Sequence, residues 1–525
     1  MIQATPGDVV HNSDSEVSAA NTLRRVAELS TAATIVGSAA VGLRASPDGW
    51  QVVAWAPSGT PLPHGLRGEA TEVADGSLLV GACDADNAAA LRQLIPWLRP
   101  KPVVGRGVSF GFGDRLGVAT PGHIRALREN PGVAPVFAQQ SARELARTGR
   151  TYQDVLDAAT FGALAAGWAA GYGADADHLK TTVDIDAGVQ AGFTMFTADP
   201  IALVPDLPAD SHPDVVRRAF EMVPWASLED DPRAFQARYP EVLDADGVSV
   251  ALPRDRLIVA AARFGAAVAH LATMHRHLLA TAGERAVEFE VAVDETAYPT
   301  SAVDHVYIVT ELRRLGVSWA SLAPSFVGRF EKGTDYRGDP AAFAADLAIH
   351  AALARALGSY TLSVHSASDK FSIYPTLARE SRGAVHLKTS GTSYLEALRT
   401  MAEFEPDLLR RIWRVALETY STSRSSYWVS ATVEGLPEPQ QLTDNSVASL
   451  LDSPSTREIL HVAFGAIRGH GDTDPAGREG ASLRDELLSM LWAHRETYWS
   501  RLATHLGRHL QPFSTSARLA EDGAS

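Results

Sequence analysis

The segments YTLSVHSASDK at 360–370 and AVHLKTSGTS at 384–393 decide the fold of this chain. Each is a short apolar run that ends in polar or charged residues and is followed by a helical pattern. The same pattern recurs from Val103 to about Met401, in the segments VVGRGVSFGFGDRLG, ADHLKTTVDI, FTMFTADP, VEFEVAVDET and GVSWASLAP. Strands that alternate with helices in this way lie parallel and are joined by right-handed crossovers. The region therefore belongs to the α/β class.

The number of these units favours a closed barrel over an open sheet. About seven or eight strand–helix units over roughly 300 residues are typical of a (β/α)8 TIM-like barrel. Their polar clusters follow many different strands, and a barrel collects the loops of all its strands at one end. An open doubly wound sheet would instead concentrate such residues at one switch point. We therefore predict a (β/α)8 barrel.

The flanking regions are assigned from their composition. Residues 1–20 are polar and are predicted to be a disordered tail. Residues 21–100 are predicted to form a small N-terminal α/β subdomain that ends in a helix capped by Asp84 or Asp86. The barrel domain then spans residues 101–401, with an insertion at 201–256. Residues 402–525 are rich in helical patterns and are predicted to form a helical C-terminal cover.

Composition narrows the class of protein. The 525 residues include 47 Lys and Arg against 62 Asp and Glu, a net charge of −15, and so acidic a surface repels nucleic acid. The single cysteine, Cys83, excludes an internal disulfide and a cysteine-rich metal site. We see no apolar run near the ~20 residues that cross a bilayer and no signal peptide at the start. We expect a cytoplasmic enzyme, able to form a homo-oligomer, that acts on a small molecule without nucleic-acid or membrane partners.

Three histidines follow strand patterns. His178 and His386 lie in the two copies of HLKT, and His365 lies in SVHSASDK. Neutral imidazole is a common ligand of transition metals, and three nitrogen donors leave positions open for a substrate. The three residues lie far apart in the sequence, so a structural role or a hydrogen bond to substrate stays an alternative for each. A divalent zinc, nickel, cobalt, manganese or iron ion would suit these donors.

Carboxylates accompany the same strand ends. Asp177 precedes His178, Asp294 and Glu295 close the segment VEFEVAVDE, and Asp199 ends FTMFTAD. Such a carboxylate can bind a metal or transfer a proton, or it can cap the helix that follows. Because side chains alternate along a strand, Asp177 and His178 would both face the barrel interior only if a loop begins there.

Further polar residues in these loops are candidates for binding an anionic substrate. Lysine and arginine can hold a carboxylate, and lysine can also polarise a carbonyl group. Each of these residues could equally be a solvated surface residue. The candidates are Lys180, Lys388, Asp114, Arg115, Asp369, Lys370 and, in the long loop FEKGTDYRGDP, Lys332.

Several common catalytic motifs are absent from the sequence. It contains no Walker A loop, no Gly-x-Ser-x-Gly elbow and no His-Glu-x-x-His helix. The run GVSFGFGDRLG has a Gly-x-Gly but lacks the third glycine and the acidic partner of a dinucleotide site. The absence of these motifs therefore argues against phosphoryl transfer, serine or zinc proteolysis and nicotinamide chemistry.

Six long motifs resemble the tagaturonate/fructuronate epimerase family. They are SFGFGDRLGVATPGHI, GYGADADHLKTT, VDETAYPTSAVDH, LAPSFVGRFEKGTDYRGD, SVHSASDKFSIYP and VHLKTSGTSYLEAL, within residues 105–411. The resemblance implies a metal-dependent barrel enzyme that interconverts D-tagaturonate and D-fructuronate. The site residues that it implies are the metal ligands His178, His365 and His386, the proton acceptor Asp177 and the proton donor Glu295. The run Ala-Asp-Pro at 198–200 departs from the family pattern, which bears on the choice of sugar.

The chemistry of this epimerisation constrains the mechanism. The two ketouronates differ at a carbinol carbon that the ketone does not activate, so enolisation cannot invert it. A base can instead remove the hydroxyl proton, after which the adjacent carbon–carbon bond breaks and re-forms on the other face of the aldehyde. A divalent metal would act as a Lewis acid in this retro-aldol route. Alternatives are an epimerase of free fructose and tagatose, a metal-dependent sugar aldolase or isomerase, and a sugar-acid-binding protein without catalysis.

Overall fold

The computed structural model describes residues 32–47, 49–105, 107–358, 360–468, 471–473 and 479–522. The predicted tail at 1–20 lies outside the described residues, as do the first residues of the predicted subdomain. Contacts between residues divide the chain into two units. The N-terminal unit comprises Met1–Arg99 and Thr160–Ala170, and the barrel unit comprises Pro100–Ala159 and Gly171–Ser525.

The N-terminal unit is built on a five-stranded antiparallel sheet with the order β1-β2-β3-β5-β4. After the sheet, helix α2 (Ala85–Leu94) begins at Asp84, whose carboxylate accepts a hydrogen bond from the backbone N–H of Asn87 at 2.9 Å. One of the two predicted helix caps is therefore confirmed. The remaining elements are β1 (Ala32–Val36), β2 (Ala39–Ser46), β3 (Gly49–Pro57), β4 (Glu69–Val73), β5 (Gly76–Ala82) and η1 (Pro96–Leu98).

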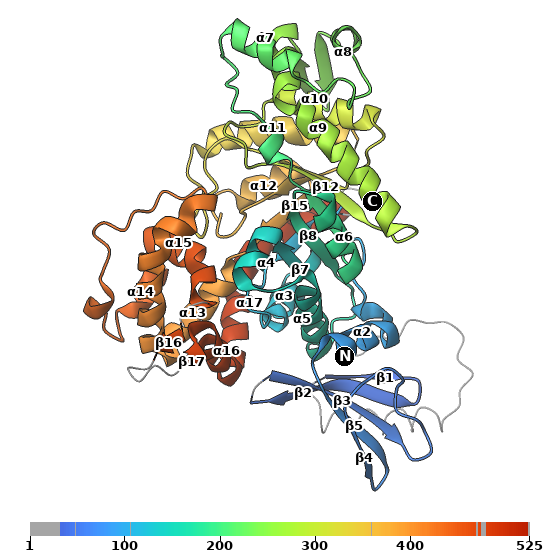
Figure 1. The fold of residues 1–525 in the computed structure, drawn as a ribbon, viewed down its shortest axis with the longest axis vertical. Coiled ribbons are helices and arrows are strands. Elements are labelled where there is room, and N and C mark those ends of the chain that lie inside the picture. Colours follow the sequence, from blue (N-terminus) through green and yellow to red (C-terminus); the bar gives the residue numbers. More distant parts are fainter. Residues whose placement is uncertain are drawn as a thin grey trace. The chain divides into compact units, whose positions relative to one another are not determined.

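Eight strands of the barrel unit close into a barrel (Figure 1). Their order follows the chain, β6-β7-β8-β9-β12-β13-β14-β15, and β15 pairs with β6 in parallel to close the ring. The predicted (β/α)8 fold is therefore confirmed. The strands are β6 (Ser109–Phe112), β7 (Ala134–Ser141), β8 (Gly173–Leu179), β9 (Met195–Ala198), β12 (Glu288–Val293), β13 (Ser321–Pro324), β14 (Thr361–Val364) and β15 (Val385–Thr389).

Helices follow the strands, as the alternating pattern predicts. Helix α10 (Ala302–Arg314), for example, begins at Ser301, whose hydroxyl forms a reciprocal capping box with Asp304. The helices that accompany the other strands are α3 (Thr120–Glu129), α4 (Ala142–Thr148), α5 (Tyr152–Ala165), α6 (Thr182–Ala191), α11 (Pro340–Ala356), α12 (Tyr374–Ser381) and α13 (Thr392–Phe404).

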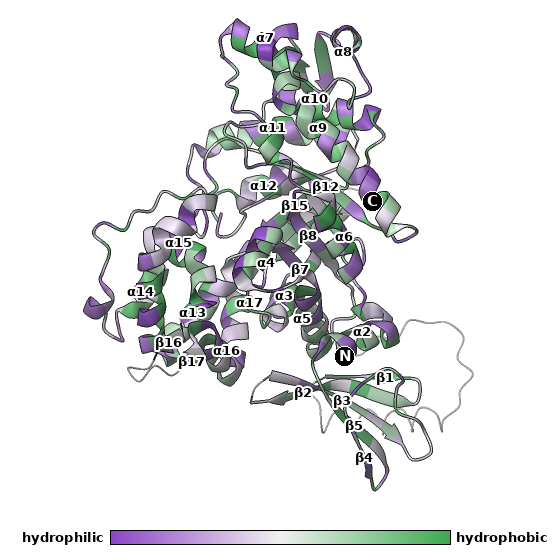
Figure 2. Cartoon of the chain, viewed as in Figure 1, coloured by the Kyte–Doolittle hydropathy of each residue, from purple (hydrophilic) through white to green (hydrophobic). Residues whose placement is uncertain are grey.

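The predicted insertion at 201–256 follows β9 and ends within the first turn of a long helix, α9 (Arg254–Ala282). Helix α7 (Pro213–Glu221) carries both hydrophilic and hydrophobic residues (Figure 2), and its apolar Val216 and Phe220 pack against a cluster that includes Val259 of α9. The other elements of the insertion are η2 (Ile201–Leu203), α8 (Pro232–Arg238), β10 (Val242–Ala245) and β11 (Val248–Ala251).

Helix α9 corrects one expectation from the sequence. It is long and apolar enough to cross a membrane by length and composition, although we expected no such run. Inside the protein, however, 78% of its apolar window is buried. The core helix of a globular domain shows the same composition, because its side chains are buried against other side chains on every face.

The C-terminal region is mainly helical in its described part. The indole N–H of Trp499 donates to the carbonyl of Val118 at 2.8 Å and so joins the last helix to the loop before α3. Two short strands, β16 (Gly471–Thr473) and β17 (Glu479–Ser482), form a small antiparallel pair. The helices are α14 (Pro406–Ser423), η3 (Arg424–Ser426), η4 (Pro439–Gln441), η5 (Val447–Leu451), α15 (Pro454–Val462), η6 (Ala463–Arg468), α16 (Leu483–Ala493) and α17 (Arg495–Asp522).

Candidate active site

Two cavities lie at the carboxyl ends of the barrel strands. The inner cavity is small, about 30 Å³, and the outer cavity measures about 960 Å³. The inner cavity is lined by Gln139, Ser141, Arg143, Glu144, Asp177, His178, Asp294, Glu295, Lys332, His365, Ser366, Lys388, Ser390 and Tyr427. Both cavities share Asp294, Glu295, Lys332, His365, Ser366 and Tyr427.

Two of the predicted histidines meet a carboxylate in the inner cavity. The ring centroids of His178 and His365 are 4.9 Å apart. Oδ1 of Asp294 lies 3.1 Å from Nδ1 of His365 and 3.9 Å from Nε2 of His178. These three ligand atoms all lie within 4.8 Å of one another, so the group could hold a metal ion.

The other nitrogen of each histidine contacts a second carboxylate. Nδ1 of His178 is 2.9 Å from Oδ1 of Asp177, and Nε2 of His365 is 2.8 Å from Oε1 of Glu290. Nε2 of His178 is buried and has no hydrogen-bond partner in the described part of the chain, and Nδ1 of His365 lies 3.1 Å from Oδ1 of Asp294, the carboxylate of the same group. A carboxylate behind each imidazole, with the opposite nitrogen left for an ion, is the arrangement found around protein-bound metals. The residues therefore fit a bound cation.

The backbone of β8 changes conformation where these residues meet. His178 has a φ of 54°, in the left-handed region that non-glycine residues seldom adopt. The pairing of β8 with β9 shifts its register between Ala176 and Leu179. Regular alternation stops there, and Asp177 and His178 both line the inner cavity. This explains how neighbouring residues serve one site.

Lys388 lies buried among carboxylates in the barrel. Its Nζ is 2.7 Å from Oδ2 of Asp175, 2.8 Å from Oδ1 of Asp177 and 2.6 Å from Oε1 of Glu290. Burial by itself would lower the pKa of Lys388, but these carboxylates hold it well above its ordinary value. The lysine is therefore a fixed cation that neutralises part of the negative charge around it.

The carboxylate charges also move the pKa values of their neighbours. Burial would raise the pKa of Asp177, but His178 and Lys388 outweigh it and hold this pKa well below its ordinary value. Burial would lower the pKa of the two histidines, but Asp177 raises that of His178 to about 9 and Asp294 raises that of His365 to about 10. Asp177 is therefore ionised at neutral pH and can accept a proton.

Glu295 lies on the opposite side of His178 from Asp177. Its Oε1 is 4.0 Å from Nε2 of His178 and 3.1 Å from Nη2 of Arg143. Glu295 also forms a second group that could hold a metal, together with His178 and Asp199. The departure noted at 198–200 therefore falls beside the site.

His386 lies deeper than the other two histidines. It is the second residue of β15, two residues before Lys388 on the same face of the strand. Its Nδ1 is 2.9 Å from Oγ of Ser109, and burial lowers the pKa of His386 to about 3. Its buried Nε2 has no hydrogen-bond partner among the described residues. The metal-binding groups found in the described chain do not include His386, so its role as a ligand stays a prediction.

Three of the predicted lysines occupy different surroundings. Lys332 lines both cavities, and burial, followed by the nearby charge of Arg143, lowers its pKa. Lys180 is exposed and does not line the inner cavity. The buried ammonium of Lys370 donates to three backbone carbonyls of the surrounding loops, those of Glu331, Thr334 and Ser368.

The Asp-Arg pair after β6 stabilises its own loop. The carboxylate of Asp114 accepts hydrogen bonds from the backbone N–H groups of Leu116, Gly117 and Ala119 at 2.7–3.1 Å. Nη2 of Arg115 is 2.8 Å from Oε1 of Glu144, which lines the inner cavity. Neither predicted substrate-binding residue lines that cavity itself.

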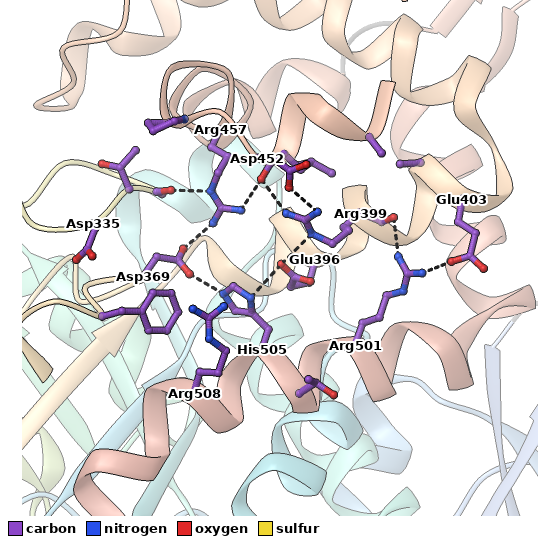
Figure 3. A pocket seen from close by; sticks show the side chains of 18 of the residues that line it. Asp335, Asp369, Glu396, Arg399, Glu403, Asp452, Arg457, Arg501, His505 and Arg508 are labelled. Atoms are coloured by element: carbon purple, nitrogen blue, oxygen red, sulfur yellow. Dashed lines mark hydrogen bonds and ion pairs between the residues drawn. The ribbon is translucent and has the colours of Figure 1, made fainter. Parts of the chain in front are cut away.

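Asp369 lies in a separate cavity of about 900 Å³ (Figure 3). Its carboxylate binds Arg457 at 2.9 Å and Nε2 of His505 at 2.6 Å. His509 completes a third group of potential metal ligands, but its Nε2 accepts the backbone N–H of Asp369 at 3.0 Å. The histidine lone pair is thus already used, and we interpret this group as a structural network.

Several residues of the site were missed in the sequence analysis. Asp175 and Glu290 lie two and four residues before Asp177 and Asp294, so strand alternation places each pair on one face and could have identified them. Tyr427 comes from the C-terminal region, where no pattern connects it to the barrel. The other unpredicted residues of the inner cavity are Gln139, Ser141, Arg143, Glu144, Ser366 and Ser390.

Comparison with known proteins gives one consistent result. The model of the tagaturonate epimerase family, UxaE, matches residues 63–513. A tagaturonate/fructuronate epimerase of Thermotoga maritima is 37% identical over 454 residues, which are 86% of this chain and 90% of that protein. Crystal structures of the fructuronate-tagaturonate epimerase UxaE from Cohnella laeviribosi, native and with one glycerol, superpose with a TM-score of 0.85 at 31% identity, covering 95% of this chain and 99% of theirs. The chain therefore belongs to the tagaturonate epimerase family.

Proposed function

We propose that this protein interconverts D-tagaturonate and D-fructuronate. The choice of substrate is based on membership of the tagaturonate epimerase family. The observation that carries the chemistry is the pairing of His178 and His365 with Asp294, beside the ionised carboxylate of Asp177. A binding protein without catalysis has no need for oriented imidazoles next to a proton acceptor.

A divalent cation held by His178 and His365 is part of this proposal. Asp294 lies within ligand distance of the same group, and the unpartnered Nε2 of His386 makes that residue the further candidate ligand. When bound, the cation supplies positive charge that stabilises negative charge on the ketone oxygen of the substrate. Mixed imidazole and carboxylate donors suit zinc, nickel, cobalt, manganese or iron.

The proton transfers are assigned to two carboxylates. Asp177 takes the proton of the carbinol hydroxyl, whose oxygen electrons form the aldehyde while the adjacent carbon–carbon bond breaks towards the ketone. The aldehyde turns over, the bond re-forms on its other face, and Glu295 gives a proton to the new alkoxide. In each turnover the acceptor gains one proton and the donor loses one, and exchange with water restores both.

The test is NMR of purified protein with D-fructuronate, in a metal-loaded sample and in a sample stripped with EDTA. We expect D-tagaturonate only in the metal-loaded sample. Free three-carbon products would identify an aldolase, and conversion of D-fructose but not of D-fructuronate would identify a ketohexose epimerase. No conversion of the ketouronate by metal-loaded protein would reject the proposal.

A further inference from the structure

Three lysine or arginine side chains line the inner cavity, and two of them already have carboxylate partners. Nη2 of Arg143 lies 3.1 Å from Glu295. Nζ of Lys388 lies within 2.8 Å of three carboxylates, those of Asp175, Asp177 and Glu290. Because their charges are compensated, neither residue offers an uncommitted positive charge to a ligand.

Lys332 is the third cation and has a different partner. Its Nζ donates to the hydroxyl of Ser366 at 2.5 Å and lies 5.8 Å from the ring centroid of Tyr427. No carboxylate lies within ion-pair distance of Lys332 in the described ranges of the chain. Lys332 is half-buried, and taking a cation even partly out of water is costly without a counter-charge. An anionic ligand would supply that charge.

A second hydrogen-bond donor lines the same two cavities. The hydroxyl of Tyr427 is buried and has no hydrogen-bond partner in the part of the chain that the structure describes. Like Lys332, Tyr427 lies at the boundary that the inner and outer cavities share. A buried hydroxyl without a partner loses the hydrogen bonds that it makes in water, so this position also favours a ligand with oxygen acceptors.

We infer that Lys332, assisted by Tyr427, binds the carboxylate group of the substrate. This assignment rests on the proposed function, which supplies a substrate with one carboxylate. Asp177 lines the inner cavity but not the outer one, and its charge would repel that group from the end where it contacts His178. The substrate would therefore lie with its ketone end towards the histidines and its carboxylate at the boundary with the outer cavity.

The position of the carboxylate matters for the retro-aldol route. Cleavage divides the six-carbon ketouronate into dihydroxyacetone, as its enediolate, and a three-carbon aldehyde that keeps the carboxylate, 2-hydroxy-3-oxopropanoate. The hydroxyl proton goes to the base, the bonding electrons go to the enediolate, and re-addition to the other aldehyde face reverses both changes. The aldehyde fragment must turn without leaving. An ion pair at its far end can retain it during that turn.

The first experiment is independent of turnover. D-Glycerate resembles the aldehyde fragment and carries its carboxylate, while glycerol has a CH2OH group in that place. Titration calorimetry of metal-loaded protein should show D-glycerate binding about 10- to 100-fold more weakly to Lys332→Met than to the unmodified chain, since a hydrogen bond to a charged group is lost. Glycerol affinity should change less than about threefold, because it offers Lys332 no charge.

Conservative variants separate charge from structure. Lys332→Arg keeps a cation, and we expect it to retain D-glycerate binding within about fivefold. Tyr427→Phe should weaken D-glycerate binding by a smaller factor, about three- to tenfold. Equal loss of D-glycerate and glycerol binding in Lys332→Met, or unchanged D-glycerate binding, would overturn the assignment. Neither result depends on whether the ketouronates are the substrates.

A second experiment detects the escaping fragment. Metal-loaded Lys332→Met incubated with D-tagaturonate should release dihydroxyacetone, measured with a coupled reductase, while the unmodified chain should release at least about tenfold less per epimerisation. Epimerisation by Lys332→Met at the original rate, without released dihydroxyacetone, would contradict a retaining role. Absence of epimerisation by the unmodified chain would instead reject the proposed function.

Discussion

Asp177 is the residue on which the proposed proton transfer depends. It contacts His178 at 2.9 Å and Lys388 at 2.8 Å, and both hold its pKa well below the ordinary value. In Asp177→Asn the amide oxygen can still accept a hydrogen bond from His178, but the side chain cannot take a proton. We expect turnover to fall at least about 100-fold, while metal bound per chain, measured by elemental analysis, stays the same. Turnover within threefold of the original would remove Asp177 from the mechanism.

Asp294 provides the matched comparison, because its Oδ1 lies 3.1 Å from Nδ1 of His365 and 3.9 Å from Nε2 of His178. Asp294→Asn removes the charge at the same strand end and should lower metal affinity by more than about tenfold. Competition with a chelating dye measures this affinity without any assay of turnover. Equal metal affinity in the two variants would show that Asp294 is not a ligand.

At the scale of elements, Arg457 of α15 joins two active-site loops to the C-terminal helices. Its Nε donates to the carbonyl of Gly333 at 2.9 Å, its Nη1 to that of Leu451 at 3.0 Å, and its Nη2 to Asp369 at 2.9 Å. The loops that it holds also carry Lys332 and His365. Figure 3 shows this guanidinium between the segments that it connects.

Arg457→Met should therefore destabilise the barrel unit. The change leaves the carbonyl of Gly333 and part of a buried carboxylate without a donor, while the carbonyl of Leu451 keeps its hydrogen bond from Arg399. We expect the free energy of unfolding to fall by about 3 kcal/mol. Urea unfolding followed by circular dichroism measures the change. Arg501→Met on the same cavity wall is the control, because it removes a partly exposed ion pair with Glu403 and one hydrogen bond to the carbonyl of Arg399. We expect this variant to lose only about 1 kcal/mol. Equal losses in both variants would contradict the special role of Arg457.

At the scale of the whole molecule, buried neutral histidines make the fold sensitive to acid. Burial lowers the pKa of His123 to about 4 and that of His509 to about 3. His123 stacks on Phe112 and its Nε2 is 2.8 Å from the hydroxyl of Ser393. Both histidines lie away from the proposed metal group.

The sign of the pH dependence follows from these shifts. Between pH 6.5 and about 4, the unfolded chain binds a proton at His123 that the folded chain does not bind. Stability therefore falls as the pH falls through this range, by about 1.4 kcal/mol per pH unit for each such histidine. Urea unfolding of metal-free protein at pH 7 and pH 5 measures the fall. His123→Gln should reduce the dependence, and an unchanged slope in this variant would exclude His123 as a cause.

The sequence by itself determined the barrel, because alternating strands and helices leave a local hydrophobic pattern. The caps at Asp84 and Ser301 could likewise be predicted from neighbouring residues alone. It also made His178 and His365 candidates for one site, since polar residues that end parallel strands gather at one end of a barrel, and both line the inner cavity. These predictions depend on interactions within a few residues or on the topology of the fold.

Only the tertiary structure decided which of these side chains meet. Strand register and loop packing decide three features of the site. They are the left-handed backbone at His178, the depth of His386 within β15 and the position of Asp369 in another cavity. Tyr427 reaches the site from a separate region of the chain. A shift of one residue in a strand reverses which side chains face inward. Contacts between distant segments fix that register, and no local pattern in the sequence records them.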